Sequence, residues 1–182
     1  MEDDTIIKDP AVFKIYIDTA EFFKLGHLVF GFGSSGQEPN RFDESKAGPY
    51  YRILRGGYAL DFYFNLQGGF CYYSREALQK IGMMDDVHYI NALEHVEHTF
   101  RLSMHGFYTP FWAFADVCGS RRYLDWYHDG REYSTTIEQD ELYRKRLHGA
   151  FSWFRTLYNI NVNQIPRPTQ EAIDAFIRKR VD

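Results

Sequence analysis

Cysteine is scarce in this sequence of 182 residues, which contains only Cys71 and Cys118. Their spacing matches neither a CxxC motif nor a zinc-ligand pattern, so a disulfide framework and a zinc-finger module are excluded. Both cysteines lie in apolar surroundings ("GGFCYY" and "FADVCGS"). We expect reduced thiols in the core, as is typical of a cytoplasmic protein.

Long apolar runs and a secretion signal are also missing. No apolar run approaches the roughly 18 residues that a membrane-spanning helix needs. The N-terminal segment MEDDTIIKDP is acidic, whereas a signal peptide has a basic start followed by an apolar stretch. We therefore expect a soluble, cytoplasmic protein with no transmembrane segment.

Positive charge is limited, while aromatic residues are abundant. The chain has 21 Lys and Arg against 25 Asp and Glu, a net charge of −4, and no long basic stripe. This balance makes nucleic acid an unexpected partner. Aromatic residues account for 18% of the chain, which fits either an aromatic-rich core or a cleft that stacks on sugar or base rings.

Apolar periodicity and turn residues predict strands that alternate with helices, which is typical of an α/β domain. The length suits one domain, or one domain with a helical appendage. Ser74 and Thr169 are expected as helix N-caps, and Gly82 as a helix end. The expected elements are a strand before Asp9–Pro10, helices at 11–26, 74–82, 91–102, 138–157 and 169–180, and strands at 27–32, within 50–74 and within 106–117.

The stretch NALEHVEHTFRL, residues 91–102, concentrates acids and histidines. Asn91 followed by Glu94 predicts a helix N-terminus of the capping-box type. Helical periodicity then places Glu94, Glu97, His98 and Arg101 on one face, with Glu97 and Arg101 as a favourable i,i+4 pair. This pattern fits a solvated charged face. It fits a zinc site less well, because His95 and His98 do not have the HExxH spacing.

A second stretch, LQGGFCYYSREALQKIGMMDD, precedes this helix. The glycine pair Gly68–Gly69 at a strand end permits either a bulge or turn, or the close approach of a ligand to the backbone. The short helix that follows leads back to the acidic helix. A strand, a glycine opening and an acidic helix N-terminus together predict one side of a cleft.

Together the two stretches resemble the family 2 glycosyltransferases of the GT-A fold and, more distantly, the polypeptide GalNAc-transferases. These families carry a Gly-Gly-aromatic segment, an R-E-x-(F/L)-x-x-(I/V)-G-x-x-D segment and an acidic helix with a following glycine. The matching residues, in chain order, are Gly68, Gly69, Phe70, Arg75, Glu76, Leu78, Ile81, Gly82, Asp85, Glu94, Glu97, Arg101 and Gly106.

The resemblance implies a partial GT-A domain, a three-layer α/β fold of the nucleotide-diphospho-sugar transferase type. Residues 1–160 would form its acceptor-side part without the N-terminal nucleotide-binding half, and 161–182 a C-terminal linker and helix. The family's metal-binding DxD motif corresponds to "EDD", that is Glu2, Asp3 and Asp4, with Asp4 as the main ligand. These acids would hold Mn²⁺ or Mg²⁺, which prefer carboxylate oxygens and would neutralise the leaving diphosphate. His128 corresponds either to a late metal ligand or to an ordinary loop histidine.

The resemblance also implies roles for the other residues. Gly68, Gly69 and Phe70 would frame the sugar and the acceptor, with Glu97 and Arg101 supporting the substrate side. Glu94 matches the first acid of the family's catalytic pair, while His95 stands where inverting members carry the catalytic base. Because an imidazole can accept a proton near neutral pH, Glu94 and His95 are the expected catalytic residues.

The implied function is metal-assisted transfer of a sugar from a nucleotide-sugar, with a UDP-sugar expected, to a saccharide acceptor in polysaccharide biosynthesis. Two alternatives stay open. One is a catalytically silent subunit that associates with a partner chain or with a second copy. The other is a metal-dependent hydrolase that uses Glu94, His95 and His98.

Overall fold

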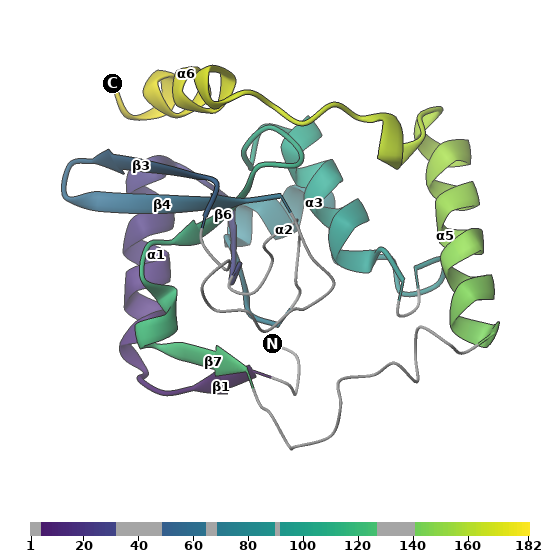
Figure 1. The fold of residues 1–182 in the computed structure, drawn as a ribbon, viewed down its shortest axis with the longest axis horizontal. Helices are drawn as coiled ribbons and strands as arrows, with labels where there is room; N and C mark the ends of the chain where they lie inside the picture. The colour runs from purple at the N-terminus through teal and green to yellow at the C-terminus, as the bar shows by residue number, and fades with distance from the viewer. Residues whose placement is uncertain (1–4, 32–48, 65–68, 90–91, 127–140) are drawn as a thin grey trace.

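The computed structural model describes residues 5–31, 49–64, 69–89, 92–126 and 141–182. Within these ranges the chain is a mixed α/β protein with five α-helices and three small antiparallel sheets (Figure 1). The expected α/β class is confirmed at this level. The elements are β1 (Thr5–Ile7), α1 (Ala11–Phe23), β2 (His27–Val29), β3 (Tyr51–Arg55), β4 (Tyr58–Tyr63), β5 (Cys71–Tyr73), α2 (Arg75–Ile81), α3 (Glu94–Met104), β6 (Phe114–Val117), the 3₁₀ turn η1 (Ser120–Arg122), β7 (Leu124–Trp126), α5 (Glu141–Tyr158), the 3₁₀ turn η2 (Val162–Gln164) and α6 (Gln170–Val181).

Three predicted helix boundaries are confirmed by their capping contacts. The hydroxyl of Ser74 accepts a hydrogen bond from the backbone N–H of Ala77 at 3.2 Å, and α2 then ends at Gly82 with φ +83°. The hydroxyl of Thr169 accepts in the same way from the N–H of Ala172 at 3.2 Å. These caps satisfy helix-end groups that would otherwise lack partners.

The start of α3 differs from the prediction. The first helical residue is Glu94, and the N-cap is Leu93, whose φ of 62° is left-handed and whose side chain gives no cap. Leu93 contributes its carbonyl instead, which accepts from the N–H of Glu97 at 2.8 Å. Asn91, the predicted N-cap, lies outside the described residues. Glu94 is therefore in the first turn itself, where the helix dipole favours a carboxylate.

The strand predicted within 106–117 is also shorter than expected. Only β6, Phe114–Val117, pairs with β4. The preceding residues form a turn, in which the Thr109 hydroxyl donates to the Ala113 carbonyl and Trp112 has φ 71°. A left-handed backbone conformation interrupts a strand.

The pair β2–β5 forms the middle layer between α1 and α3. On one face, the Tyr16 ring of α1 lies edge-on to Phe70 with centroids 4.9 Å apart. On the other face, the Thr99 hydroxyl of α3 lies 3.4 Å from His27 Nε2. Because strand side chains alternate between faces, β2 buries both of its faces, and His27 is fully buried. The three residues of β5 are half-buried.

β6 lies alongside β2 and runs in the same direction. At one end the Gly26 N–H donates to the Phe107 carbonyl at 2.6 Å, and at the other the Gly31 N–H donates to Asp116 Oδ2 at 3.0 Å. α3 runs in the same direction as β5, since His95 lies against Cys71 at the start of the strand and His98, one turn further along, lies against Tyr73 at its end. The ends of β2 and β6, the start of β5 and the starts of α1 and α3 therefore gather on one side, which also carries β1 and β7 (Figure 1). We call it the candidate-site edge.

The two C-terminal helices pack on the rest of the domain. α5 contacts α3 through Phe154 and Tyr158, whose rings lie 5.0 and 4.9 Å from Phe100. α6 buries Ile173 and Ile177 completely. No helix in the described ranges is long and apolar enough to cross a membrane.

Cys71 and Cys118 form no disulfide, as predicted. Neither is fully buried, however, so the expectation of two core thiols is only partly met. Cys71 begins β5 at the candidate-site edge, and Cys118 follows β6.

Candidate functional site

Phe70, the aromatic residue of the Gly-Gly-Phe motif, lies between α1 and β2. The Phe70 carbonyl accepts from the Phe30 N–H at 2.8 Å, which extends the β2–β5 ladder by one bond. The Phe70 ring is buried against Tyr16, and Phe13 lies 6.2 Å away with 51% of its surface exposed. Gly69 is buried, and Gly68 lies outside the described residues. Phe70 is therefore positioned mainly from inside the domain.

Glu94 and His95 lie where α3 begins, beside this segment. His95 Nδ1 is 4.0 Å from the Cys71 thiol, although the two residues are 24 apart in sequence. One carboxylate oxygen of Glu94 is buried and has no hydrogen-bond partner within the described part of the chain. The structure thus brings two of the predicted site segments together at the candidate-site edge.

Glu97 and Arg101 form the predicted i,i+4 pair, but it is buried rather than solvated. Glu97 is 1% exposed, and Arg101 Nε lies 2.7 Å from its Oε1. The Tyr158 hydroxyl donates to the same oxygen. Arg101 also donates to the carbonyls of Ile81 at 2.7 Å and Met83 at 2.9 Å. These contacts are all within the protein, and they fasten α3 to α5 and to the end of α2.

His98 also turns inward, so a solvated charged face is wrong for Glu97 and His98. His98 is 1% exposed and its Nε2 lies 3.0 Å from the Gly82 carbonyl. Burial lowers the pKa of His98 below its ordinary value. The carbonyl partner indicates that Nε2 carries the proton. This nitrogen is therefore not available to a metal.

A second buried histidine was not identified from the sequence. His27 stacks on Tyr73 with centroids 4.4 Å apart, and burial lowers its pKa to about 3. No spacing signal in "GHLVF" marks it as buried. Within the described ranges, no three His, Cys, Asp or Glu side chains are arranged to hold a metal ion.

The predicted metal ligands Glu2, Asp3 and Asp4 lie outside the described residues, as does His128. β1 begins at Thr5, the residue after Asp4, and Thr5 is paired with Trp126 of β7. This pair lies at the candidate-site edge (Figure 1). The metal site therefore stays a prediction.

Asp116 was also missed by the sequence reasoning. Its fully buried carboxylate accepts hydrogen bonds from the Tyr16 hydroxyl at 2.5 Å, the Gly31 N–H at 3.0 Å, the Val117 N–H at 2.7 Å and the Ser120 hydroxyl at 2.6 Å. Burial raises its pKa to about 7, although the hydrogen bonds oppose this shift. An acid inside the apolar run "FWAFADV" was the available signal, because a buried charge requires partners.

The arrangement can accept a proton at the start of α3. A carboxylate and an imidazole occupy adjacent positions there, and a helix N-terminus stabilises negative charge. The neighbouring residues Gly69 and Phe70 are both buried, so they border this place from inside the domain.

Comparisons with known proteins give no match to any family model, curated protein or solved structure. No family membership is therefore established.

Proposed function

We propose that this chain is the acceptor-side part of a GT-A glycosyltransferase of the family 2 type. It would transfer a sugar from a nucleotide-sugar, with a UDP-sugar as the expected donor, to a saccharide hydroxyl. The observation that carries the proposal is the contact between the start of α3 and the start of β5. His95 Nδ1 and the Cys71 thiol lie 4.0 Å apart, which supports assigning the residues next to Cys71 and the start of the acidic helix to one site.

In this proposal Glu94 and His95 remove the proton from the acceptor hydroxyl. An imidazole has an ordinary pKa near 6.5, so it can act as a base at neutral pH. Glu94, in the first turn of α3, would orient the imidazole or accept the proton itself. Phe70 and Gly69 would define the wall against which the sugar and the acceptor lie.

Glu97 and Arg101 act in a supporting role. Arg101 donates hydrogen bonds to the carbonyls of Ile81 and Met83. Glu97 forms an ion pair with Arg101 and accepts a hydrogen bond from the Tyr158 hydroxyl. This network holds the first turn of α3 in place relative to α2 and α5. A role in direct substrate binding stays a prediction, because Glu97 is buried.

The donor side depends on a divalent metal, for which Glu2, Asp3 and Asp4 are the expected ligands. Bound Mn²⁺ or Mg²⁺ would neutralise negative charge on the leaving nucleoside diphosphate. The hydrolase alternative receives less support, because His98 directs its Nε2 to the Gly82 carbonyl.

Titration calorimetry of the full chain with UDP, with and without Mn²⁺, tests the donor side. We expect UDP to bind in a Mn²⁺-dependent manner, and Asp4→Asn to abolish this dependence. A chain that binds neither UDP nor Mn²⁺ would contradict the proposal and favour a catalytically silent subunit. Tightly held zinc in the purified protein would favour the hydrolase.

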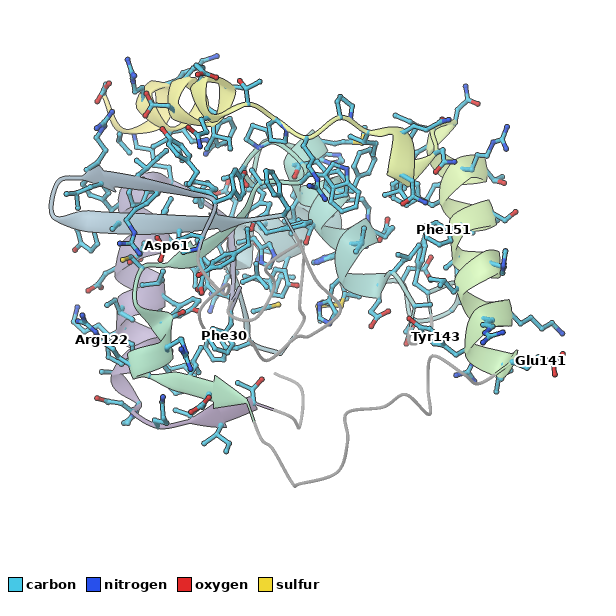
Figure 2. All side chains as sticks on the ribbon, viewed as in Figure 1. Phe30, Asp61, Arg122, Glu141, Tyr143 and Phe151 are labelled. Atoms are coloured by element: carbon cyan, nitrogen blue, oxygen red, sulfur yellow. The ribbon has the colours of Figure 1, made fainter. Side chains whose placement is uncertain are left out.

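Activity measurements test the acceptor side. We expect Glu94→Gln and His95→Gln to lower the rate of sugar transfer by about 10²-fold or more, the usual contribution of a general base. The same decrease is expected in the rate at which the donor is hydrolysed in the absence of an acceptor. UDP affinity should be unchanged in both variants. Glu141→Gln is the matched control, because Glu141 is exposed at the outer end of α5 (Figure 2). Equal activity in Glu94→Gln, His95→Gln and this control would contradict the assignment.

A further inference from the structure

The Asp116 carboxylate connects four parts of the chain around the candidate-site edge. Its hydrogen-bond donors come from α1, from the end of β2, from β6 itself and from η1. Asp116 has no exposed surface, so it does not touch a substrate. Any effect on the site must pass through the groups that it holds.

Two of these groups also hold Phe70. Tyr16 donates its hydroxyl to Asp116 while the edge of its ring packs on Phe70 at 4.9 Å. Gly31 donates its N–H to Asp116, and the neighbouring Phe30 N–H donates to the Phe70 carbonyl at 2.8 Å. The Phe70 ring and its backbone are thus connected to the same carboxylate along separate routes.

Gly31 follows β2 and lies close to the ring of Tyr63. A side chain at Gly31 would collide with the ring of Tyr63, so only glycine fits there. In Figure 2 Phe30 lies on the side of the molecule that carries β7, which is the candidate-site edge. Because Phe30 and Gly31 are adjacent in the chain, a shift of Gly31 after loss of the Asp116 contact should also move Phe30.

We propose that Asp116 is a positioning residue, which fixes the place of Phe70 in the candidate site through Tyr16 and Gly31. Four donors converge on its two carboxylate oxygens, a number that only the ionised form can fully accept. The loss of this charge, or of one donor, should shift Phe70 without removing any group that faces a ligand. The ligand part of this inference rests on the proposed function, while the positioning part does not.

Among the described residues around Asp116, the tyrosines and the facing acid are the titratable neighbours to consider. Burial raises the pKa of Tyr16, Tyr63 and Tyr108, so these rings stay neutral. Asp61 is the cross-strand neighbour of Asp116 on β4 and pairs with Arg52, with 2.5 Å between Arg52 Nε and Asp61 Oδ1. A titration seen at Gly31 would therefore report Asp116.

The first experiment needs no ligand. In ¹H–¹⁵N spectra of the full chain, we expect the Gly31 amide signal to titrate with a midpoint near pH 7, because its acceptor is the Asp116 carboxylate. The Asp116→Asn variant should lose this titration and show shifted Phe70 signals. Asp61→Asn is the matched control on the neighbouring strand (Figure 2), and it should keep the titration. A Gly31 signal that does not titrate, or that titrates unchanged in Asp116→Asn, would overturn the inference.

The second experiment uses Tyr16→Phe, which removes one of the four hydrogen-bond donors to Asp116 and is less disruptive to folding than Asp116→Asn. With UDP and UDP-glucose as probes in the presence of Mn²⁺, we expect UDP-glucose affinity in Tyr16→Phe to fall about fivefold. UDP affinity should stay the same, because the proposed function assigns Phe70 to the wall of the sugar site and not to the nucleotide site. A purely structural role would lower both affinities together or neither. Either of those results, in a folded variant, would overturn the inference.

The two experiments separate the two proposals. If the wild-type chain binds neither UDP nor UDP-glucose, the proposed function fails, and the Gly31 and Phe70 signals still decide the role of Asp116. If the wild-type chain binds both ligands while Asp116→Asn leaves the Phe70 signals unmoved, the positioning role fails and the proposed function stands.

Discussion

Two acid–histidine pairs of α3, Glu94–His95 and Glu97–His98, contain the same kinds of residue but differ in burial. Glu94 and His95 are half-buried at the candidate-site edge. Glu97 and His98, three residues later in each case, are 1% exposed and are held by Tyr158, Arg101 and the Gly82 carbonyl. A run of acids and histidines therefore does not by itself mark a site. The position of each residue around the helix decides whether it can react or only supports.

At neutral pH the largest expected effect is a loss of stability on replacing Glu97. We predict that Glu97→Gln lowers the free energy of unfolding by about 3 kcal/mol, because it leaves the Arg101 charge without its carboxylate. The value is at the lower end for a buried pair, since Arg101 is 20% exposed and keeps two carbonyl partners. Urea unfolding measures it. If Glu97→Gln lowered the free energy of unfolding as little as Glu94→Gln does, the distinction between the two acid–histidine pairs would be lost.

The next effect is the pH dependence of stability that results from the buried His27. The pKa of His27 is about 3 in the folded chain against about 6.5 unfolded. Below pH 6.5 the unfolded chain binds a proton that the folded chain does not, so stability falls by about 1.4 kcal/mol per pH unit down to about pH 3. Replacing His27 should remove this slope.

The control for this pH effect is the exposed His105. We expect His105→Gln to keep the wild-type slope and His27→Gln to flatten it, both measured by urea unfolding at several pH values. Asp116 acts in the opposite direction, because its raised pKa makes stability fall as pH rises towards about 7. The difference between variant and wild type is therefore the quantity to compare. Parallel curves for His27→Gln and wild type would contradict the prediction.

The smallest expected effect on stability comes from replacing Glu94. We predict that Glu94→Gln lowers the free energy of unfolding by only about 0.5 kcal/mol, the usual contribution of a carboxylate to a helix N-terminus. The same substitution should have the large effect on transfer activity described above. A stability loss above about 2 kcal/mol would show that Glu94 is a structural residue like Glu97, and would weaken its assignment as a catalytic group.

Some features of the site were predictable, because they depend on local contacts. The Glu97–Arg101 pair follows from helical spacing alone and is confirmed. The caps at Ser74 and Thr169 involve residues three positions apart and were also predicted correctly. The start of α3 was misplaced, because the left-handed conformation of Leu93 is not signalled by its residue type. A backbone conformation that leucine rarely adopts is maintained by surrounding structure.

The sequence by itself determined the alternation of strands and helices, most helix boundaries and the charged face of α3, since each depends on residues within about one helical turn. Only the tertiary structure decided that this face is half buried, that His95 lies against Cys71 and that Asp116 joins α1, β2, β6 and η1. These contacts join residues up to 100 positions apart. They exist because α1 and α3 cover opposite faces of the β2–β5 pair, an arrangement set by burial of the whole core rather than by any short pattern.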